Sequence, residues 1–114
     1  MSNQPRNVAM ELDKCRMDLR DARNAKTLAY QAWKLSEAKQ RMHLRAIDDA
    51  KGQRWADADV AAALTVMRND PEHEIGKAWL KLVELRATVE RLEADHDVLN
   101  RANWDAIQRG KFGV

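Results

Sequence analysis

The side chains best suited to binding a ligand are basic ones spread along the first half of the chain. They are Arg16, Arg20, Arg23, Lys34, Arg41, Arg45 and Arg54, and Trp55 follows directly after the last of them. Guanidinium and ammonium groups neutralise phosphates, and an indole ring can stack on an exposed base. This set predicts a nucleic-acid surface on the first helix. We keep it as the alternative function, because the net charge is only +2 and Trp at helical spacing more often packs in a core.

Two histidines are the residues that could bind a metal ion or transfer a proton. They are His43 and His96, and Asp95 and Asp97 flank the second. Their spacing matches no recognised ligand pattern, and the sequence has no Gly-rich phosphate loop, HExxH sequence or Ser elbow. We therefore expect no enzymatic activity, no metal site and no cofactor. The single Cys15 cannot form an intrachain disulfide, and its apolar helical position predicts a small buried side chain.

The composition indicates an all-α protein that forms one helical domain over residues 1–114. Charged residues make up 33% of the chain and aromatic residues 5%, and there are only four Gly and two Pro. Such a sequence suits long helices or coiled coils and leaves little material for strands. The sequence shows no signal-peptide pattern and no run of about 18 apolar residues, so we expect a cytoplasmic protein that does not bind membranes.

The first helix is expected over about residues 6–68. Its first half carries an apolar stripe at spacings of three, four or seven: Val8, Leu12, Cys15, Leu19, Ala22, Ala29 and Trp33. Gly52, preceded by Lys51, is the one position that resembles a helix C-terminus. Because helix-forming sequence resumes at once, we favour a continuous or kinked helix. A true break at Gly52 would instead produce a three-helix bundle.

A turn is expected at residues 69–71, where Asp70 precedes Pro71 and carboxylates follow. The second helix then runs over about residues 72–109, with a tail over residues 110–114. Its apolar positions form a heptad repeat: Ile75, Ala78, Leu82, Leu85, Val89, Leu92 and Leu99. A connection this short predicts a long antiparallel helical hairpin that resembles a coiled coil. Ile75 and Trp79 are expected to pack beside the small side chains that precede the turn.

The position of the turn sets the register of this hairpin. At a rise of about 1.5 Å per residue, the first helix would span about 95 Å and the second about 57 Å. Trp33 would then lie within about two helical turns of Trp104, His43 would lie across from His96, and residues 6–30 would have no partner in the chain. The uncovered residues predicted to form a partner interface are Val8, Leu12, Cys15 and Leu19.

Together these features predict a non-enzymatic helical protein–protein interaction module that self-associates or docks on a larger partner. Residues 1–55 carry twelve Lys and Arg against seven Asp and Glu, whereas residues 71–100 carry four against seven. The basic first segment and the acidic second one can pair within the chain. We therefore expect less free positive surface for nucleic acid. The small size and the densely charged helices resemble, in style, the accessory or regulatory proteins that bacteriophages and bacteria encode, although no motif identifies a family.

Overall fold

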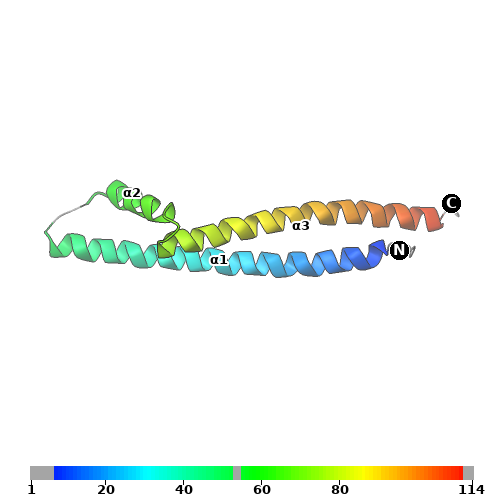
Figure 1. Ribbon diagram of the computed structural model, residues 1–114, viewed down its shortest axis with the longest axis horizontal. Helices are drawn as coiled ribbons and strands as arrows, with labels where there is room; N and C mark the ends of the chain where they lie inside the picture. The colour runs from blue at the N-terminus through cyan, green and yellow to red at the C-terminus, as the bar shows by residue number, and fades with distance from the viewer. Residues whose placement is uncertain (1–6, 53–54, 112–114) are drawn as a thin grey trace. The chain divides into compact units, whose positions relative to one another are not determined.

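The described residues fold into three α-helices and contain no strand. α1 covers Val8–Ala50, α2 covers Asp57–Arg68 and α3 covers Glu74–Lys111 (Figure 1). This computed structural model describes residues 7–52 and 55–111. The predicted all-α class is therefore confirmed.

The chain divides into two compact units. Unit 1 comprises the described residues up to 24 and from 87 onward, and unit 2 comprises residues 25–86. α1 and α3 contribute to both units, whereas α2 belongs to unit 2. In unit 1, Arg16 contacts His96 and Arg23 contacts Glu93, so the two helices run antiparallel there. The predicted antiparallel hairpin is thus present.

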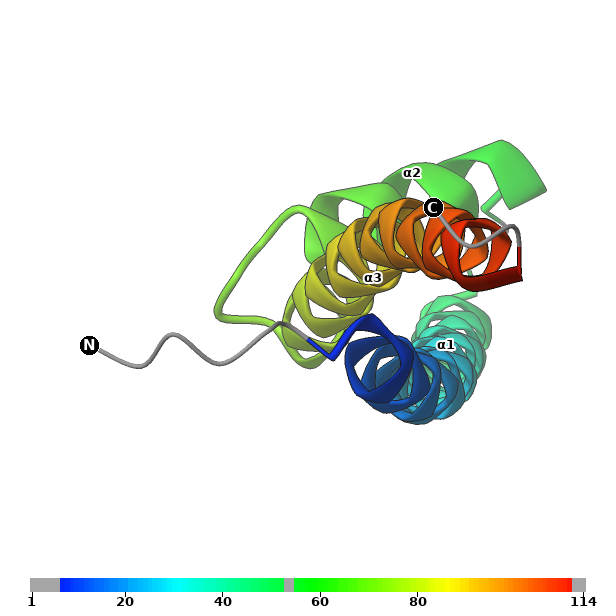
Figure 2. The same ribbon diagram turned by 90° about the vertical axis from the view of Figure 1, so that its right-hand side faces the viewer.

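The first helix ends near Gly52. α1 stops at Ala50, and Gly52 has a φ of 67°. Glycine adopts this left-handed conformation readily because it has no Cβ, and a left-handed residue just past the last turn ends a helix. Figure 2 shows α2 as a rod separate from α1. The favoured continuous helix over residues 6–68 is therefore wrong, and the alternative break at Gly52 is correct.

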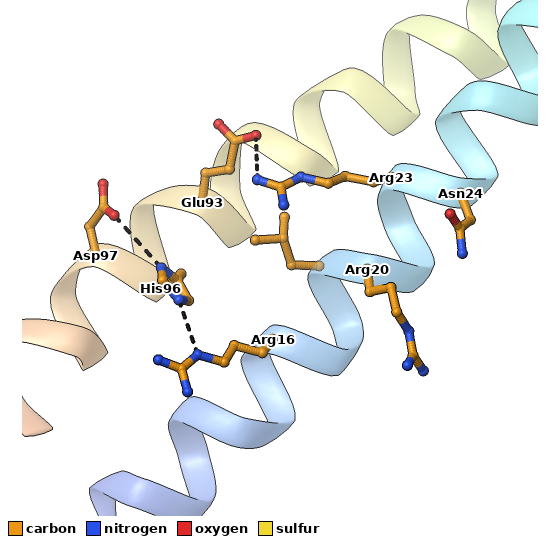
Figure 3. Close-up of a pocket in the computed structure, with 8 residues that line it drawn as sticks. Arg16, Arg20, Arg23, Asn24, Glu93, His96 and Asp97 are labelled. Carbon is orange, nitrogen blue, oxygen red and sulfur yellow. Dashed lines mark hydrogen bonds and ion pairs between the residues drawn. The ribbon is translucent and has the colours of Figure 1, made fainter.

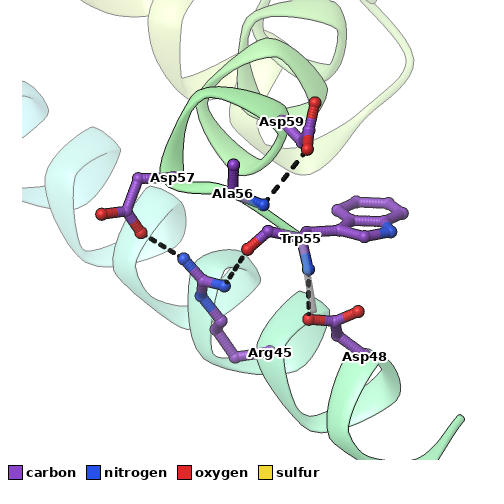
Figure 4. Close-up of polar contacts among 6 residues, drawn as sticks. All are labelled: Arg45, Asp48, Trp55, Ala56, Asp57 and Asp59. Carbon is purple, nitrogen blue, oxygen red and sulfur yellow. Dashed lines mark hydrogen bonds and ion pairs between the residues drawn. The ribbon is translucent and has the colours of Figure 1, made fainter. Parts of the chain in front are cut away.

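Side chains of α1 hold the connection to α2. Asp48 Oδ2 accepts the N–H of Trp55 at 2.8 Å, and Arg45 donates to the carbonyl oxygen of Trp55 at 2.7 Å (Figure 4). The same guanidinium group also contacts Asp57. In the first turn of α2, Asp59 accepts the backbone N–H of the N-cap residue at 3.1 Å, as in half of a capping box. These contacts fix the point where the chain reverses.

The connection between α2 and α3 is longer than predicted, because it occupies residues 69–73 and α3 begins at Glu74. Asp70 Oδ1 accepts the N–H of Glu72 at 2.9 Å, and His73 Nδ1 accepts the N–H of Ile75 at 3.1 Å. Short polar side chains that bind nearby backbone in this way favour turns over helix. α3 then continues to Lys111, past the predicted end at residue 109. Residues 6 and 112–114, the predicted helix start and most of the predicted tail, lie outside the described residues.

The core of unit 2 draws on all three helices. Its buried residues are Ala29 and Trp33 from α1, Val60 and Leu64 from α2, and Ile75 and Leu82 from α3. Trp79 packs against this cluster, with its ring centroid 4.7 Å from that of Trp33. Ile75 and Trp79 therefore pack with α2, as expected from the small residues before the turn.

The register of α1 and α3 differs from the predicted one. In unit 1, Cys15 Sγ lies 3.5 Å from the carbonyl oxygen of Leu92, and in unit 2 Trp33 packs against Trp79. The two wrong pairings are Trp33 with Trp104 and His43 with His96. The reason is that the chain first reverses at Gly52 rather than at Asp70, so α2 takes the place beside the last part of α1 that α3 was expected to fill.

Candidate functional site

A groove in unit 1 gathers three of the arginines predicted to contact nucleic acid. It has a volume of about 570 Å³ and is lined by Arg16, Leu19, Arg20, Arg23, Asn24, Glu93, His96 and Asp97. The three arginines share one side of α1 because they are four and three residues apart. From α3, His96 and two carboxylates face the same groove (Figure 3).

Two of these three guanidinium groups contact α3. Arg16 Nε donates to His96 Nε2 at 3.4 Å, and Arg23 lies 3.4 Å from Glu93. Arg20 pairs with its chain neighbour Asp21 at 3.6 Å and points away from the histidine in Figure 3. The charged side chains of both ion pairs are half exposed or more, so these pairs add little stability. Each arginine can therefore exchange its carboxylate partner for another anion.

The remaining basic residues of the predicted nucleic-acid surface do not line this groove. Lys34, Arg41, Arg45 and Trp55 belong to unit 2, and Arg54 lies outside the described residues. Arg41 pairs with Glu37 at 3.5 Å, and Lys34 Nζ lies 4.6 Å from the centroid of the Trp33 ring. Arg45 holds the connection between α1 and α2. Local contacts therefore engage most of this second group.

The structure places the predicted partner interface in the interior of unit 1. Val8 is half-buried, and the other three residues, Leu12, Cys15 and Leu19, are buried. Leu19 packs in one cluster with Ala22 of α1 and Val89 of α3. Burial raises the pKa of the Cys15 thiol, and the nearby carboxylates of Asp95 and Asp18 raise it further. The reason for assigning these residues to an interface, an uncovered seam, therefore does not hold.

The described residues offer little for metal chemistry. Within residues 7–52 and 55–111, no group of three or more His, Cys, Asp and Glu side chains is arranged to hold a metal ion. His43 is exposed on α1, and His96 is partly buried in the groove of unit 1. Over the same residues, none of the helices has the length and apolar character needed to cross a bilayer.

An exposed apolar strip lies on α1 in unit 2, and the sequence pattern did not single it out. Leu28, Leu35 and Met42 are 66%, 73% and 74% exposed. Residues that recur every seven positions lie on one side of a helix, so these three side chains form a line. We call this strip the outer face of α1; its members, all exposed, are Leu28, Ala32, Leu35, Lys39, Met42 and Ala46.

The outer face of α1 lies opposite the side of the helix that enters the core of unit 2. Trp33 is buried in that core, and Leu35 follows it by two residues. A helix turns about 100° per residue, so these two side chains point about 160° apart. α1 thus has two apolar sides in unit 2, and only one of them is covered by described residues.

The chain was also compared with known proteins. No protein-family model, curated protein or solved structure matches it.

Proposed function

We propose that this chain is a non-enzymatic helical protein–protein interaction module, of the accessory type, that binds through the outer face of α1. The observation that carries the proposal is the line of Leu28, Leu35 and Met42, three large apolar side chains that are each about two-thirds exposed or more. Single exposed apolar residues are common on protein surfaces, but a regular row at heptad spacing is the pattern of a helix–helix seam.

The shape of the outer face suits another helix. Ala32 and Ala46 alternate with the large residues, and small side chains allow a neighbouring helix to approach closely. The core of unit 2 lies on the opposite side of α1. Side chains of the outer face can therefore be substituted without creating a cavity in that core. Binding here would bury apolar area that water now covers, which is the main favourable contribution to association.

A selection experiment tests the proposal and does not require an identified partner. The wild-type chain is used to select binders from a displayed library of helical peptides, and the double variant Leu28→Asp/Leu35→Asp is used for counter-selection. We expect binders that lose at least about 100-fold in affinity with the double variant, because each change places a charge in a desolvated seam.

The matched control is Val66→Asp, because Val66 is an equally apolar residue of unit 2 that is 70% exposed on α2. This variant should bind the selected peptides as the wild type does. Circular dichroism melts should show all three proteins folded. If every selected peptide binds the double variant and the wild type alike, the outer face is not an interaction site.

Nucleic-acid binding is the second candidate function, and the groove of unit 1 is the observation that favours it. Arg16, Arg20 and Arg23 line one surface there. A filter-binding assay at low salt with single-stranded and double-stranded DNA and RNA tests this function. Affinity should fall steeply with added salt, because counterions are released when phosphates are neutralised.

The triple variant Arg16→Gln/Arg20→Gln/Arg23→Gln should weaken that binding at least about tenfold, since three phosphate contacts are removed. Arg91→Gln, an exposed arginine of α3 outside the groove lining, is the matched control and should leave binding unchanged. Absence of retention of any nucleic acid at low salt would remove this second candidate.

A further inference from the structure

We propose that unit 2 carries a binding site for a nucleotide of single-stranded nucleic acid, beside the end of α2. The phosphates would contact Lys34, Arg68 and Arg86, and the base would stack on Tyr30. This inference goes beyond the proposed function, because it concerns side chains other than those of the outer face of α1. It is also independent of the groove of unit 1.

Three aromatic rings form a continuous cluster in unit 2. The ring centroid of Trp33 lies 4.7 Å from that of Trp79 and 5.8 Å from that of Tyr30. Trp33 is buried and Trp79 is half-buried, whereas Tyr30 is 43% exposed. Tyr30 is therefore the ring of this cluster that a base in solution can reach most easily.

A cation from each of the three helices lies over the tryptophan rings. Lys34 Nζ of α1 is 4.6 Å from the ring centroid of Trp33. The guanidinium carbons of Arg68, the last residue of α2, and Arg86 of α3 are 5.0 and 5.5 Å from the ring centroid of Trp79. The packing of unit 2 thus brings together positive charges that are far apart in the sequence.

These three cations have no carboxylate partner among the described residues. Lys34, Arg68 and Arg86 take part in none of the ion pairs found there. An aromatic ring carries no net charge, so a cation that lies over it keeps its full charge for an anion. A guanidinium group that stacks on an indole also keeps its N–H edge free to bind a phosphate through two hydrogen bonds.

The carboxylates closest in sequence to these cations do not pair with them. They are Glu37, which pairs with Arg41, Glu72, which lies in the turn after α2, and Glu90, which follows Arg86 by four residues. The guanidinium group of Arg86 reaches back toward Trp79, seven residues before it and away from Glu90. An anion that approaches the aromatic cluster therefore meets an excess of positive charge.

A small cavity beside Tyr30 provides space for a base. Its volume is about 210 Å³, and it is lined by Lys26, Thr27, Tyr30, Leu82 and Arg86. Leu82 is buried and gives the cavity an apolar wall, as the face of a base requires. A base can stack on an aromatic side chain only when it is unpaired, so the site favours a single strand over a duplex.

Other polyanions would use less of this site. A polyphosphate, or an acidic peptide without aromatic residues, could contact the cations but has no flat ring to place against Tyr30. Cations around an exposed aromatic side chain are the combination with which proteins bind single strands: the cations follow the phosphates and the ring stacks on a base.

Fluorescence anisotropy with labelled strands tests the site in the full chain. The probes are an oligothymidylate of about twelve nucleotides, an abasic strand of the same length and charge, and a duplex. We expect the oligothymidylate to bind at least about fivefold more tightly than the abasic strand, because base stacking adds to the phosphate contacts. Binding of both strands should weaken steeply with added salt.

Two pairs of variants separate the stacked base from the phosphate contacts. Tyr30→Ala should remove the preference for the oligothymidylate, whereas Tyr30→Phe keeps the ring and should retain it. Lys34→Gln/Arg86→Gln should weaken binding of both strands at least about fivefold, since two phosphate contacts are lost. The matched control is Lys39→Gln/Lys81→Gln, which removes the same charge from exposed positions of unit 2 and should change affinity less than about twofold. Circular dichroism melts should show every variant folded.

The outcomes distinguish this inference from the other candidate functions. Equal binding of the oligothymidylate, the abasic strand and the duplex overturns the stacked base. Tighter binding of a Glu-rich peptide than of either strand overturns the nucleic-acid ligand. Binding that Arg16→Gln/Arg20→Gln/Arg23→Gln abolishes and Lys34→Gln/Arg86→Gln does not would assign the nucleic acid to the groove of unit 1 instead. Absence of binding of any strand at low salt overturns both nucleic-acid sites and leaves the interaction module, which the peptide selection tests separately.

Discussion

Unit 2 and unit 1 use the same two long helices but bury different amounts of side chain. In unit 2 the added helix α2 completes a cluster of six buried residues that includes Trp33 and the fully buried Ile75. In unit 1 five apolar residues are buried, of which Leu19, Ala22 and Val89 form one cluster with Leu92 packed against it, and the other two are Leu12 and Cys15. Two helices alone leave most of each helix surface in water, and a third helix supplies an interior.

Tryptophan illustrates the same difference. Trp33 in unit 2 is 8% exposed and packs against Trp79, whereas Trp104 in unit 1 is 62% exposed. Trp104 lines a shallow groove of about 400 Å³ whose lining residues all belong to α3. The residue type is identical, so burial is decided by whether another helix is present to cover the ring.

The change expected to affect unit 2 most is Gly76→Ala. A Cβ at Gly76 would lie 1.7 Å from the carbonyl oxygen of Asp70, and backbone cannot yield as a side-chain tip can. The start of α3 would have to move away from the preceding turn and from the core around Ile75. We expect the free energy of unfolding to fall by about 3 kcal/mol or more, as for severe overpacking. Urea unfolding followed by circular dichroism measures this loss.

Gly110→Ala is the matched control, because nothing lies within 4 Å of a Cβ at Gly110. Alanine is favoured over glycine in helices by up to about 1 kcal/mol, so this variant should not lose stability. Hydrogen exchange should localise the effect of Gly76→Ala to amides of unit 2. Equal losses from the two glycine changes would contradict the tight approach at Gly76.

Truncating one leucine in each unit measures the difference between the two cores. Leu82 in unit 2 is 1% exposed, whereas Leu92 in unit 1 is only partly buried. Leu82→Ala should reduce the free energy of unfolding by about 3 kcal/mol, since it removes apolar contacts and leaves a cavity. Leu92→Ala should reduce it by about 1.5 kcal/mol, because less apolar surface is lost. A larger effect at Leu92 would reverse the ranking of the two units.

The junction of α1 and α2 supports the more buried unit through Asp48. This carboxylate is 4% exposed, accepts the N–H of Trp55, and has a second buried oxygen, Oδ1, with no hydrogen-bond partner among the described residues. Asp48→Ala should reduce stability by about 1 to 2 kcal/mol, because the N–H of Trp55 loses its acceptor. Asp48→Asn keeps an oxygen acceptor and should lose less. Thermal melts that rank the two variants in the opposite order would show that the carboxylate charge matters more than the hydrogen bond.

The helical class could be predicted from the sequence, but the division of the first helix at Gly52 and the pairing of the helices could not. The turn at Asp70, the all-α class and the contribution of Ile75 follow from composition, spacing and helix-start residues. The register depended on one residue, Gly52. A single glycine with helix-forming neighbours is compatible with a kink or a break, and side-chain contacts of Arg45 and Asp48 with the Trp55 backbone, which join the two sides of the glycine, accompany the break. Apolar spacing does not reveal polar contacts of this kind.

The candidate site was predicted less well than the fold. The sequence pattern predicts Leu12, Cys15 and Leu19 as an interface only because the wrong register leaves them uncovered. Leu28 and Leu35 were not singled out, although their spacing of seven was readable, because the stronger stripe through Trp33 accounted for the same helix. Periodicity identifies an apolar side of a helix, but only the three-dimensional pairing shows which side remains exposed.

Cys15 provides the smallest and most local test, since its thiol reports on unit 1 alone. Burial and the nearby carboxylates of Asp95 and Asp18 raise its pKa above the ordinary value of 9.0. A thiol whose pKa is higher in the folded state binds its proton more tightly there, so its contribution to stability is complete below about pH 9 and is lost as the pH rises through the folded pKa. The free energy of unfolding should therefore fall more between about pH 8 and about pH 10 in the wild type than in Cys15→Ala, which isolates this group from the other titrations.

Alkylation of Cys15 at about pH 8 should be slow in the wild type and faster in Leu92→Ala, which opens the packing around it. Identical pH profiles for the wild type and Cys15→Ala, or rapid alkylation of the wild type, would show that the interior of unit 1 is open to water.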